Sequence, residues 1–193
     1  MSIFWLSSKF NILDSGKFGL SETPEKLGIT GWDAKNLRLA LWTKLFQKDI
    51  EQTIYVVNTH LDHIGENARQ QGALLLGKKV QEIADDFPVL LCGDFNANTS
   101  SQTYKNMIDC GFTDCANAPI NYHLPYTYQR YLLGKDIGET EKFKDDPRVL
   151  HIIDHIFYKG PIQVLRHGIL GDNYAGSYPS DHFPKMCDVL LLQ

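Results

Sequence analysis

Side chains that could do chemistry cluster at or near expected strands at four places in the chain. Two clusters come where expected strands end, the third lies within an expected strand, and the fourth lies in the last loop. A strand that delivers Asp94 and Asn96 points both side chains to one face, because alternate residues of a strand share a face. Taken alone, this pair also suits an ordinary strand-to-helix turn. The four clusters are Asn58-Thr59-His60-Leu61-Asp62-His63, Asp94 with Asn96, Asp154-His155, and Ser180-Asp181-His182.

The carboxylates of these clusters could lie close together only if a cation compensated them. Asp154 sits in the middle of the apolar segment 149–158. An acid there is costly unless it is paired, and a histidine is its natural partner. If Asp94, Asp154 and Asp181 converge at ~4 Å, each pair repels by about 4 kcal/mol at an effective dielectric near 20. Oxygen ligands beside imidazole suit Mg²⁺ or Mn²⁺, which predicts metal-assisted phosphoester hydrolysis.

One of the clusters also resembles a zinc motif. His60, Asp62 and His63 match the end of the H-x-H-x-D-H pattern that binds two zinc ions in metallo-β-lactamase-fold hydrolases. Asn58 stands where that pattern has its leading histidine. Because zinc sites need their full ligand set, we do not expect zinc here.

The elements that must position these residues are mostly strands. Strands follow strands with few helices between them, which predicts an α/β (α+β) fold of two mostly antiparallel sheets packed face to face, with helices outside in a four-layer sandwich. The segment 117–146 lacks periodicity and is expected to be a long surface excursion. Strands are expected over 3–6, 10–13, 36–46, 53–59, from 89, 149–158, 162–165 and 186–192, and helices over 66–87 and from about 101 to 109.

Composition indicates one globular domain over residues 1–193, with 43% hydrophobic and 22% charged residues. The net charge of −4 argues against a large basic surface for long nucleic acids. The four cysteines form no C-x-x-C pair and are expected to be buried thiols in a reducing compartment, not a disulfide framework or a zinc site. No apolar run approaches membrane-spanning length, so we expect a cytoplasmic protein without a membrane partner.

Together the clusters resemble the endonuclease/exonuclease/phosphatase superfamily of metal-dependent phosphoesterases. Four blocks carry the resemblance in order, and the segments Leu20-Ser21-Glu22-Thr23-Pro24 and Gly31-Trp32-Asp33 are further similar to a bacterial branch of unassigned metal-dependent hydrolases. The resemblance implies a two-sheet sandwich with the site at one rim. The four blocks are Asn58-Thr59-His60, Gly93-Asp94-Phe95-Asn96, Ile153-Asp154-His155-Ile156 and Ser180-Asp181-His182.

The resemblance also implies a role for each site residue. His182, oriented by Asp154, acts as base or phosphate stabiliser, and Asp94 holds the attacking water and can take its proton. Asn96 and His60 bind phosphate oxygens, and Asp181 helps to hold the metal, Mg²⁺ or Mn²⁺. Which of Asp94 and His182 is the general base stays open.

The chain departs from the family pattern at its N-terminus. Family members begin with a strand that carries an Asn and a later strand that carries a Glu, the principal metal ligand, and neither precedes Met1-Ser2-Ile3-Phe4 here. We therefore expect a sheet that lacks an inner strand and is completed by self-association or by a partner segment. The chain is then a fragment, is completed by another polypeptide, or is a catalytically impaired or regulatory module.

Four further residues are candidates for substrate binding. Arg38 at a strand start could clamp phosphate, whereas Arg69 on a helix face also suits an ordinary ion pair. Trp32 and Tyr128 are candidate contacts. The acidic balance favours a small phosphoester substrate. Nucleic acid is the alternative, as for a nuclease or deadenylase, with tyrosines of the excursion stacking on bases: Tyr122, Tyr126, Tyr128 and Tyr131.

Overall fold

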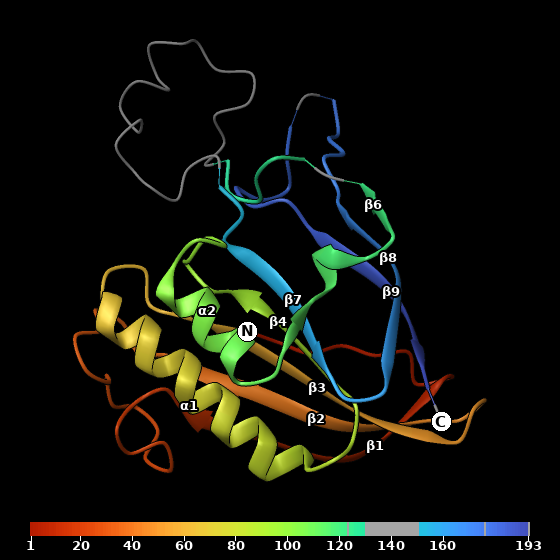
Figure 1. The fold of residues 1–193 in the computed structure, drawn as a ribbon, viewed down its shortest axis with the longest axis horizontal. Helices are drawn as coiled ribbons and strands as arrows, with labels where there is room; N and C mark the ends of the chain where they lie inside the picture. Colours follow the sequence, from red (N-terminus) through yellow and green to blue (C-terminus); the bar gives the residue numbers. More distant parts are fainter. Residues whose placement is uncertain (123, 130–150, 176, 193) are drawn as a thin grey trace.

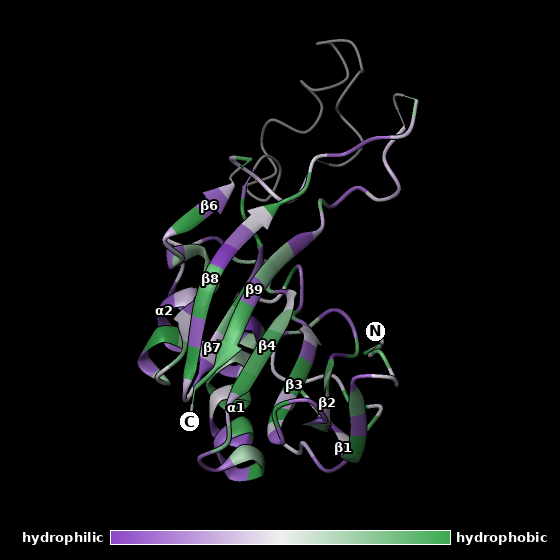
Figure 2. Ribbon diagram, turned by 90° about the vertical axis from the view of Figure 1, so that its right-hand side faces the viewer, coloured by the Kyte–Doolittle hydropathy of each residue, from purple (hydrophilic) through white to green (hydrophobic). Residues whose placement is uncertain are grey.

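The computed structural model describes residues 1–122, 124–129, 151–175 and 177–192. Two β-sheets pack face to face, and the helices α1 and α2 cover the outer face of the larger sheet (Figure 1). Figure 2 shows the same layers from the side, with β8 and β9 of the smaller sheet at the opposite end from β1 and β2. The expected fold class is confirmed, and the described residues supply a helical layer and two sheet layers.

The larger sheet contains the strands that end in candidate site residues. Its neighbours pair antiparallel except β3 and β4, which run parallel and are connected through α1, as parallel neighbours require. In spatial order its six strands are β1 (Phe10–Gly19), β2 (Leu39–Gln47), β3 (Gln52–His60), β4 (Val89–Asp94), β7 (Asp154–Lys159) and β5 (Thr113–Asp114).

The smaller sheet has three strands in the order β6 (Ile120–Tyr122), β8 (Ile162–Ile169) and β9 (Lys185–Leu191). Strands β6 and β8 are parallel, and β8 and β9 are antiparallel. An apolar layer fills the space between the two sheets, and β9 lies at an edge of the smaller one. The buried members of this layer are Leu45, Ile54, Cys115, Ile162 and Val164.

Helices α1 (Glu66–Ala84) and α2 (Gln102–Asp109) pack on the other face of the larger sheet. Asp33 binds the free amides at the start of α1, accepting from Ala68 N at 2.6 Å, and Ser101 caps α2 by accepting from Tyr104 N at 3.1 Å. The short 3-10 helix η1 (Cys115–Asn117) follows β5. The expected apolar stripe of α1 is buried at Ala68, Gly72, Leu76 and Val80.

Several boundaries differ from the sequence prediction. Residues 3–6 are not a strand, and β1 instead runs through Gly16 to Gly19, where a turn was expected. Pairing with β2 along this whole length overrides the turn preference of glycine. Strand β7 begins at Asp154 rather than at 149, so this acid lies at the rim and not in mid-strand. Most of the expected excursion, residues 130–146, lies outside the described residues.

Two further expectations concern the state of the cysteines and the presence of membrane-spanning segments. All four cysteines are free, as expected, but only Cys115 is buried, whereas Cys92, Cys110 and Cys187 are partly exposed. Among the described residues, neither α1 nor α2 combines the length and the hydropathy that a membrane span requires.

Candidate active site

The end of β4 places Asp94 at the rim of the larger sheet. Gly93 permits this because an added Cβ would lie only 2.1 Å from the carbonyl oxygen of Thr59 on β3, a distance that no side chain tolerates. In the strand register, Asp94 lies opposite His60 on β3 and opposite Asp154 on β7. Two acids and a histidine therefore meet because β3 and β4 end, and β7 begins, at the same edge.

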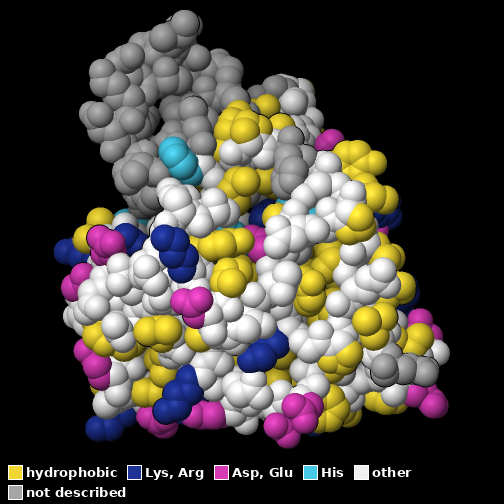
Figure 3. All heavy atoms as spheres, viewed as in Figure 1, with side chains coloured by type: hydrophobic (Ala, Val, Ile, Leu, Met, Phe, Trp, Pro, Cys, Tyr) yellow, Lys and Arg dark blue, Asp and Glu magenta, His cyan; other side chains and the backbone are white. Residues whose placement is uncertain are grey.

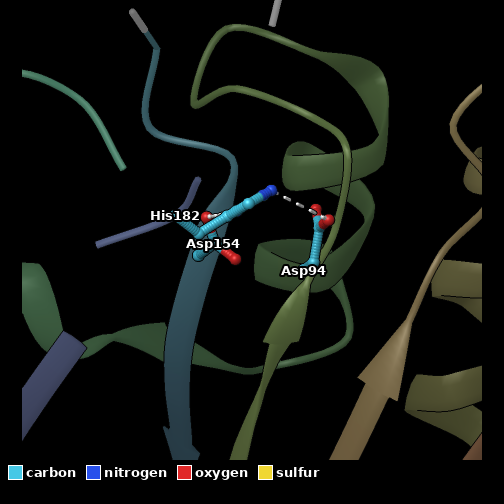
Figure 4. Close-up of side chains that lie close together, drawn as sticks. All are labelled: Asp94, Asp154 and His182. Atoms are coloured by element: carbon cyan, nitrogen blue, oxygen red, sulfur yellow. Dashed lines mark hydrogen bonds and ion pairs between the residues drawn. The ribbon is translucent and has the colours of Figure 1, made fainter. Parts of the chain in front are cut away.

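His182, in the segment before β9, completes this cluster (Figure 4). Its Nδ1 lies 2.8 Å from Asp154 Oδ2, and its Nε2 lies 4.0 Å from Asp94 Oδ2. The carboxylate can only accept at neutral pH, so Nδ1–H donates and Nε2 is directed towards Asp94. The Asp154 backbone is held by Thr127, whose Oγ1 accepts from Asp154 N at 3.1 Å. The expected pairing of Asp154 with a histidine is therefore present.

The protonation equilibria of the cluster are perturbed. Burial, together with the nearby charge of Asp154, raises the pKa of Asp94 to about 6. Burial alone would lower the pKa of His182, but the hydrogen bond and charge of Asp154 outweigh it, so that pKa is raised. A carboxylate and an imidazole whose pKa values are both raised, side by side at a rim, are the kind of groups that acid–base catalysis uses.

His60 contacts the other side of Asp94. Its Nε2 lies 3.3 Å from Asp94 Oδ2. Burial and the positive charge of Arg38 lower the pKa of His60 to about 4, so the ring is neutral at pH 7. The contact with Asp94 is then the close approach of a neutral ring to a carboxyl group and not an ion pair. This places one N–H donor at the cleft, where a phosphoryl oxygen could accept it.

The donor set of the cluster suits a divalent cation. Asp94, Asp154 and His182 each offer one ligand atom, and these atoms all lie within 4.8 Å of one another. The mutual repulsion that raises the pKa of Asp94 is what a cation would relieve. Asp181, expected to hold metal, lines the same cleft beside His182. Oxygen-rich sites of this composition favour Mg²⁺ or Mn²⁺ over softer metals.

Asn96 lies at the base of the cleft and is 7% exposed. Its backbone φ of +48° is a left-handed conformation that Asn tolerates better than most residues. Its backbone N–H donates to Asp94 Oδ1 at 2.8 Å, and its Nδ2 donates to the Leu61 carbonyl at 3.0 Å. Asn96 is therefore both a residue of the turn after β4 and a residue of the cleft lining.

Arg38 reaches the cleft because a buried acid holds it there. Its Nε lies 3.4 Å from Asp62 Oδ1, and its Nη2 lies 3.4 Å from His63 Nδ1. Asp62 is 2% exposed and also accepts from four backbone amides, those of Lys35, Asn36, Ile64 and Gly65. Although burial opposes it, these amides hold the pKa of Asp62 well below its usual range.

Asp62 is a functional residue that the sequence argument did not assign, since it entered only through the zinc pattern. Its sequence signal is an acid two positions after the strand-end His60. Its partners lie in segments 35–38 and 64–65, and their convergence on one carboxylate is not visible before folding.

The structure brings most of the candidate residues into one cleft of about 220 Å³. Tyr128 lies there with its ring centroid 4.6 Å from that of His182. Arg69 lines an adjoining cavity, where its Nη1 donates to the Asp62 carbonyl at 3.0 Å. Trp32 lines neither space, and its backbone N–H donates to Glu22 instead. The candidates in the cleft are Arg38, His60, Asp94, Asn96, Tyr128, Asp181 and His182.

A second histidine–aspartate pair lies behind the rim. His155 Nδ1 is 3.2 Å from Asp114 Oδ2, and its Nε2 is 2.9 Å from the Ala97 carbonyl. Both partners are acceptors, so a proton on either ring nitrogen has an acceptor within hydrogen-bonding distance. Burial would raise the pKa of Asp114, but the hydrogen bond and charge of His155 lower it to about 2. This pair ties the segment after β4 to β5 and β7.

Comparison with known proteins agrees with this geometry. The sequence matches the Endonuclease/Exonuclease/phosphatase family over residues 5–182. The fold is similar to that of a mannosyl-6-phosphatase from Bacteroides thetaiotaomicron, with a TM-score of 0.83 and 31% identity, covering 95% of this chain and 68% of that one.

More distant similarities point to the same fold. Nocturnin from Drosophila melanogaster is 26% identical over 205 residues, which are 87% of this chain and 31% of that protein. The chain thus spans about a third of the length of that relative. The human Nocturnin catalytic domain shares the fold with a TM-score of 0.69 and 21% identity, covering 97% of this chain and 62% of that one. The chain therefore belongs to the endonuclease/exonuclease/phosphatase family.

Proposed function

We propose that this chain is a Mg²⁺- or Mn²⁺-dependent phosphoesterase that hydrolyses a small or compact phosphoester. The observation that carries the proposal is the His182 ring, fixed by Asp154 and directed at Asp94 across 4.0 Å. The family supports phosphoester hydrolysis, and the related mannosyl-6-phosphatase supports a compact substrate. In the reaction, water attacks phosphorus in line and the bond from phosphorus to the alcohol oxygen breaks.

Each cleft residue has a task in this reaction. The Asp94–His182 pair orients the water and receives its proton, and Asp154 keeps His182 in the required tautomer. His60 Nε2–H donates to a phosphoryl oxygen, Arg38 supplies positive charge at the cleft, and the alcohol leaves with a proton from solvent. A divalent cation held by Asp94, Asp154 and Asp181 would supply charge stabilisation to the phosphoryl group when bound.

A nuclease or deadenylase is the second candidate, because the chain is also 26% identical over 212 residues, which are 95% of this chain and 41% of that protein, to a probable CCR4-Not complex 3'-5'-exoribonuclease subunit from Encephalitozoon cuniculi. The described tyrosines give it little support. Tyr126 packs on Phe183 at 5.8 Å and Tyr128 packs on His182, so neither presents a free ring to a base. Tyr122, on β6, is 66% exposed but is not among the residues that line the cleft, and Tyr131 lies outside the described residues. Lys and Arg side chains are scattered on the face shown in Figure 3 rather than gathered into a patch. Nucleic-acid strands are bound by continuous positive surfaces.

The proposal is tested by phosphate release in Mg²⁺ from a panel of small phosphomonoesters and a short oligonucleotide. We expect turnover of at least one small ester, and a loss of about 10²- to 10⁴-fold in Asp94→Asn. Asp109→Asn is the matched control, because this exposed acid at the end of α2 lies away from the cleft. Turnover confined to the oligonucleotide would support the nuclease. If no ester is cleaved, the chain is the catalytically impaired or regulatory module of the fold.

Self-association is proposed on a separate observation. In the described part of the chain β9 pairs on one side only, and Met186, Leu190 and Leu192 at this edge are 38%, 48% and 45% exposed. An unpaired apolar edge strand is a template for another strand, and we assign that role to a second copy. Sedimentation velocity tests this: a dimer is expected, and a sharp monomer at all concentrations would contradict it.

A further inference from the structure

A second cavity, of about 500 Å³, adjoins the catalytic cleft. The two spaces share His63, Asn96 and Ile153 as walls. A phosphoester whose phosphorus lies beside Asp94 could therefore extend its alcohol part past Asn96 into this cavity. The floor lies between α1 and the segment that connects β4 to α2, so three elements of the fold build it.

The cavity is lined by an unusual number of side-chain amides, which we call the amide wall: Gln70, Asn96, Asn98 and Gln102. Hydrogen bonds within the protein hold these side chains in place, and each of these bonds uses only one of the two polar atoms of the amide. Gln102 Nε2 donates to Asn106 Oδ1 at 2.8 Å, and Gln70 Nε2 donates to Glu66 Oε1 at 3.1 Å. Asn98 Oδ1 accepts from Ser100 Oγ at 2.7 Å.

Each amide of the wall retains hydrogen-bonding capacity. Among the described residues, no donor reaches the side-chain oxygens of Gln70, Asn96 and Gln102, and no acceptor reaches Asn98 Nδ2. The three oxygens remain as acceptors, and Asn98 Nδ2 and the second hydrogen of each other amide nitrogen remain as donors, for a ligand that both donates and accepts. A hydroxyl group is such a ligand, and several hydroxyls on one carbon skeleton would use several of these groups together.

Charge and shape exclude other ligand classes. Besides His63, Arg69 is the one basic side chain among the described residues that line the cavity, and the Glu66 carboxylate offsets it, so a second phosphate is poorly served. No aromatic side chain is among the lining residues on which a nucleobase could stack. Ile64, 61% exposed at the rim, and Ile153 offer apolar contact for carbon-bound hydrogens.

We infer that the amide wall binds a polyhydroxylated leaving group, so that the substrate is the phosphate ester of a sugar or sugar alcohol. This inference rests on the proposed function for the phosphoryl position, but three of the four amides, those of Gln70, Asn98 and Gln102, lie outside the cleft lining. Binding of the alcohol part needs neither metal nor turnover, and the two claims can therefore fail separately.

The binding test uses the leaving group alone. Free glucose is added to the whole protein, and saturation-transfer NMR measures contact with its ring protons. We expect clear saturation that falls about five-fold or more in Gln70→Ala/Gln102→Ala, because two hydrogen bonds are lost. Gln81→Ala is the matched control on α1, since its side chain donates to Asp85 O and lies outside the cavity lining.

The kinetic arm compares glucose 6-phosphate with phenyl phosphate in Mg²⁺. We expect the ratio of their kcat/KM values to fall about ten-fold in the double variant and to stay unchanged in Gln81→Ala. Equal glucose saturation in wild type and double variant, or an equal loss for both esters, would overturn the inference. Glucose saturation that depends on the amide wall, with no ester cleaved, would overturn the proposed function alone.

Discussion

The adjacent residues Asp154 and His155 on β7 belong to different histidine–aspartate pairs, one at the rim and one in the core. In the Asp154–His182 pair the side chains are 20% and 26% exposed, and one ring nitrogen faces a third group, Asp94, across 4.0 Å. In the Asp114–His155 pair they are 2% and 1% exposed, and both ring nitrogens are bonded.

This difference separates a pair that suits proton transfer from a pair that stabilises the fold. The rim pair holds a directed nitrogen with room beside it, so it can take up or release a proton as a reaction proceeds. The core pair has no spare hydrogen-bonding capacity on its ring, and its contribution is to fix the segment that carries Asn96. The residue types are identical in the two pairs and one member of each lies at the start of β7, so burial with complete bonding is what distinguishes them.

The largest expected effect is on activity, at the rim. His182→Gln removes the directed nitrogen while the polar side chain can still meet Asp154, so we expect kcat/KM to fall about 10²- to 10⁴-fold. The thermal midpoint should change little, because the site is partly exposed. Phosphate release and differential scanning fluorimetry measure the two quantities. Retained activity in this variant would remove His182 from the reaction.

The corresponding change in the core acts on stability. Asp114→Asn leaves the buried His155 ring without its carboxylate, and we expect the free energy of unfolding to fall by about 3–5 kcal/mol. Urea denaturation followed by circular dichroism measures this change. A loss below about 1 kcal/mol would mean that the core pair does not hold the fold as described.

The pH dependence of the same variant sharpens the comparison. The pKa of Asp114 is about 2 in the folded protein, below the unfolded value of about 3.9. A depressed pKa stabilises the fold above the unfolded value, and this contribution is lost as the pH falls through the folded value. The stability difference between wild type and Asp114→Asn should therefore shrink by about 2 kcal/mol between pH 5 and pH 2. A constant difference in urea titrations over this range would show that Asp114 is not linked to folding.

A smaller effect is expected beside the rim pair. Tyr128→Leu removes the ring that packs on His182 at 4.6 Å, and we expect kcat/KM to fall about three- to ten-fold through poorer orientation of His182. Tyr126→Leu is the matched control, because Tyr126 packs on Phe183 instead. Equal effects in both variants would indicate a general loss of packing.

Much of this account could be predicted from the sequence, for reasons that are physical. Strand alternation and the helical stripe of α1 follow from local periodicity, and they placed Asp94 and His60 at strand ends correctly. The parts that could not be predicted depend on distant partners. Asp62 is defined by amides of segment 35–36, and the strand at Gly16 and Gly19 is defined by pairing with β2.

The pairing of Asp154 shows which part of the site the sequence predicts and which part depends on the folded arrangement. Residue chemistry alone required a histidine partner without distinguishing the adjacent His155 from the distant His182, and only the family resemblance named His182. Alternation along β7 sends adjacent side chains to opposite faces, and only the folded position of the segment before β9 brings His182 to Asp154.

The most direct test of the central claim is anomalous diffraction from crystals of the protein soaked in Mn²⁺ and inorganic phosphate. The account predicts one strong manganese peak within coordinating distance of the Asp94 and Asp154 carboxylates, with phosphate oxygens beside His60, and loss of that peak in Asp94→Asn. A strong manganese peak at another place, with no manganese peak beside Asp94 and Asp154, would contradict it.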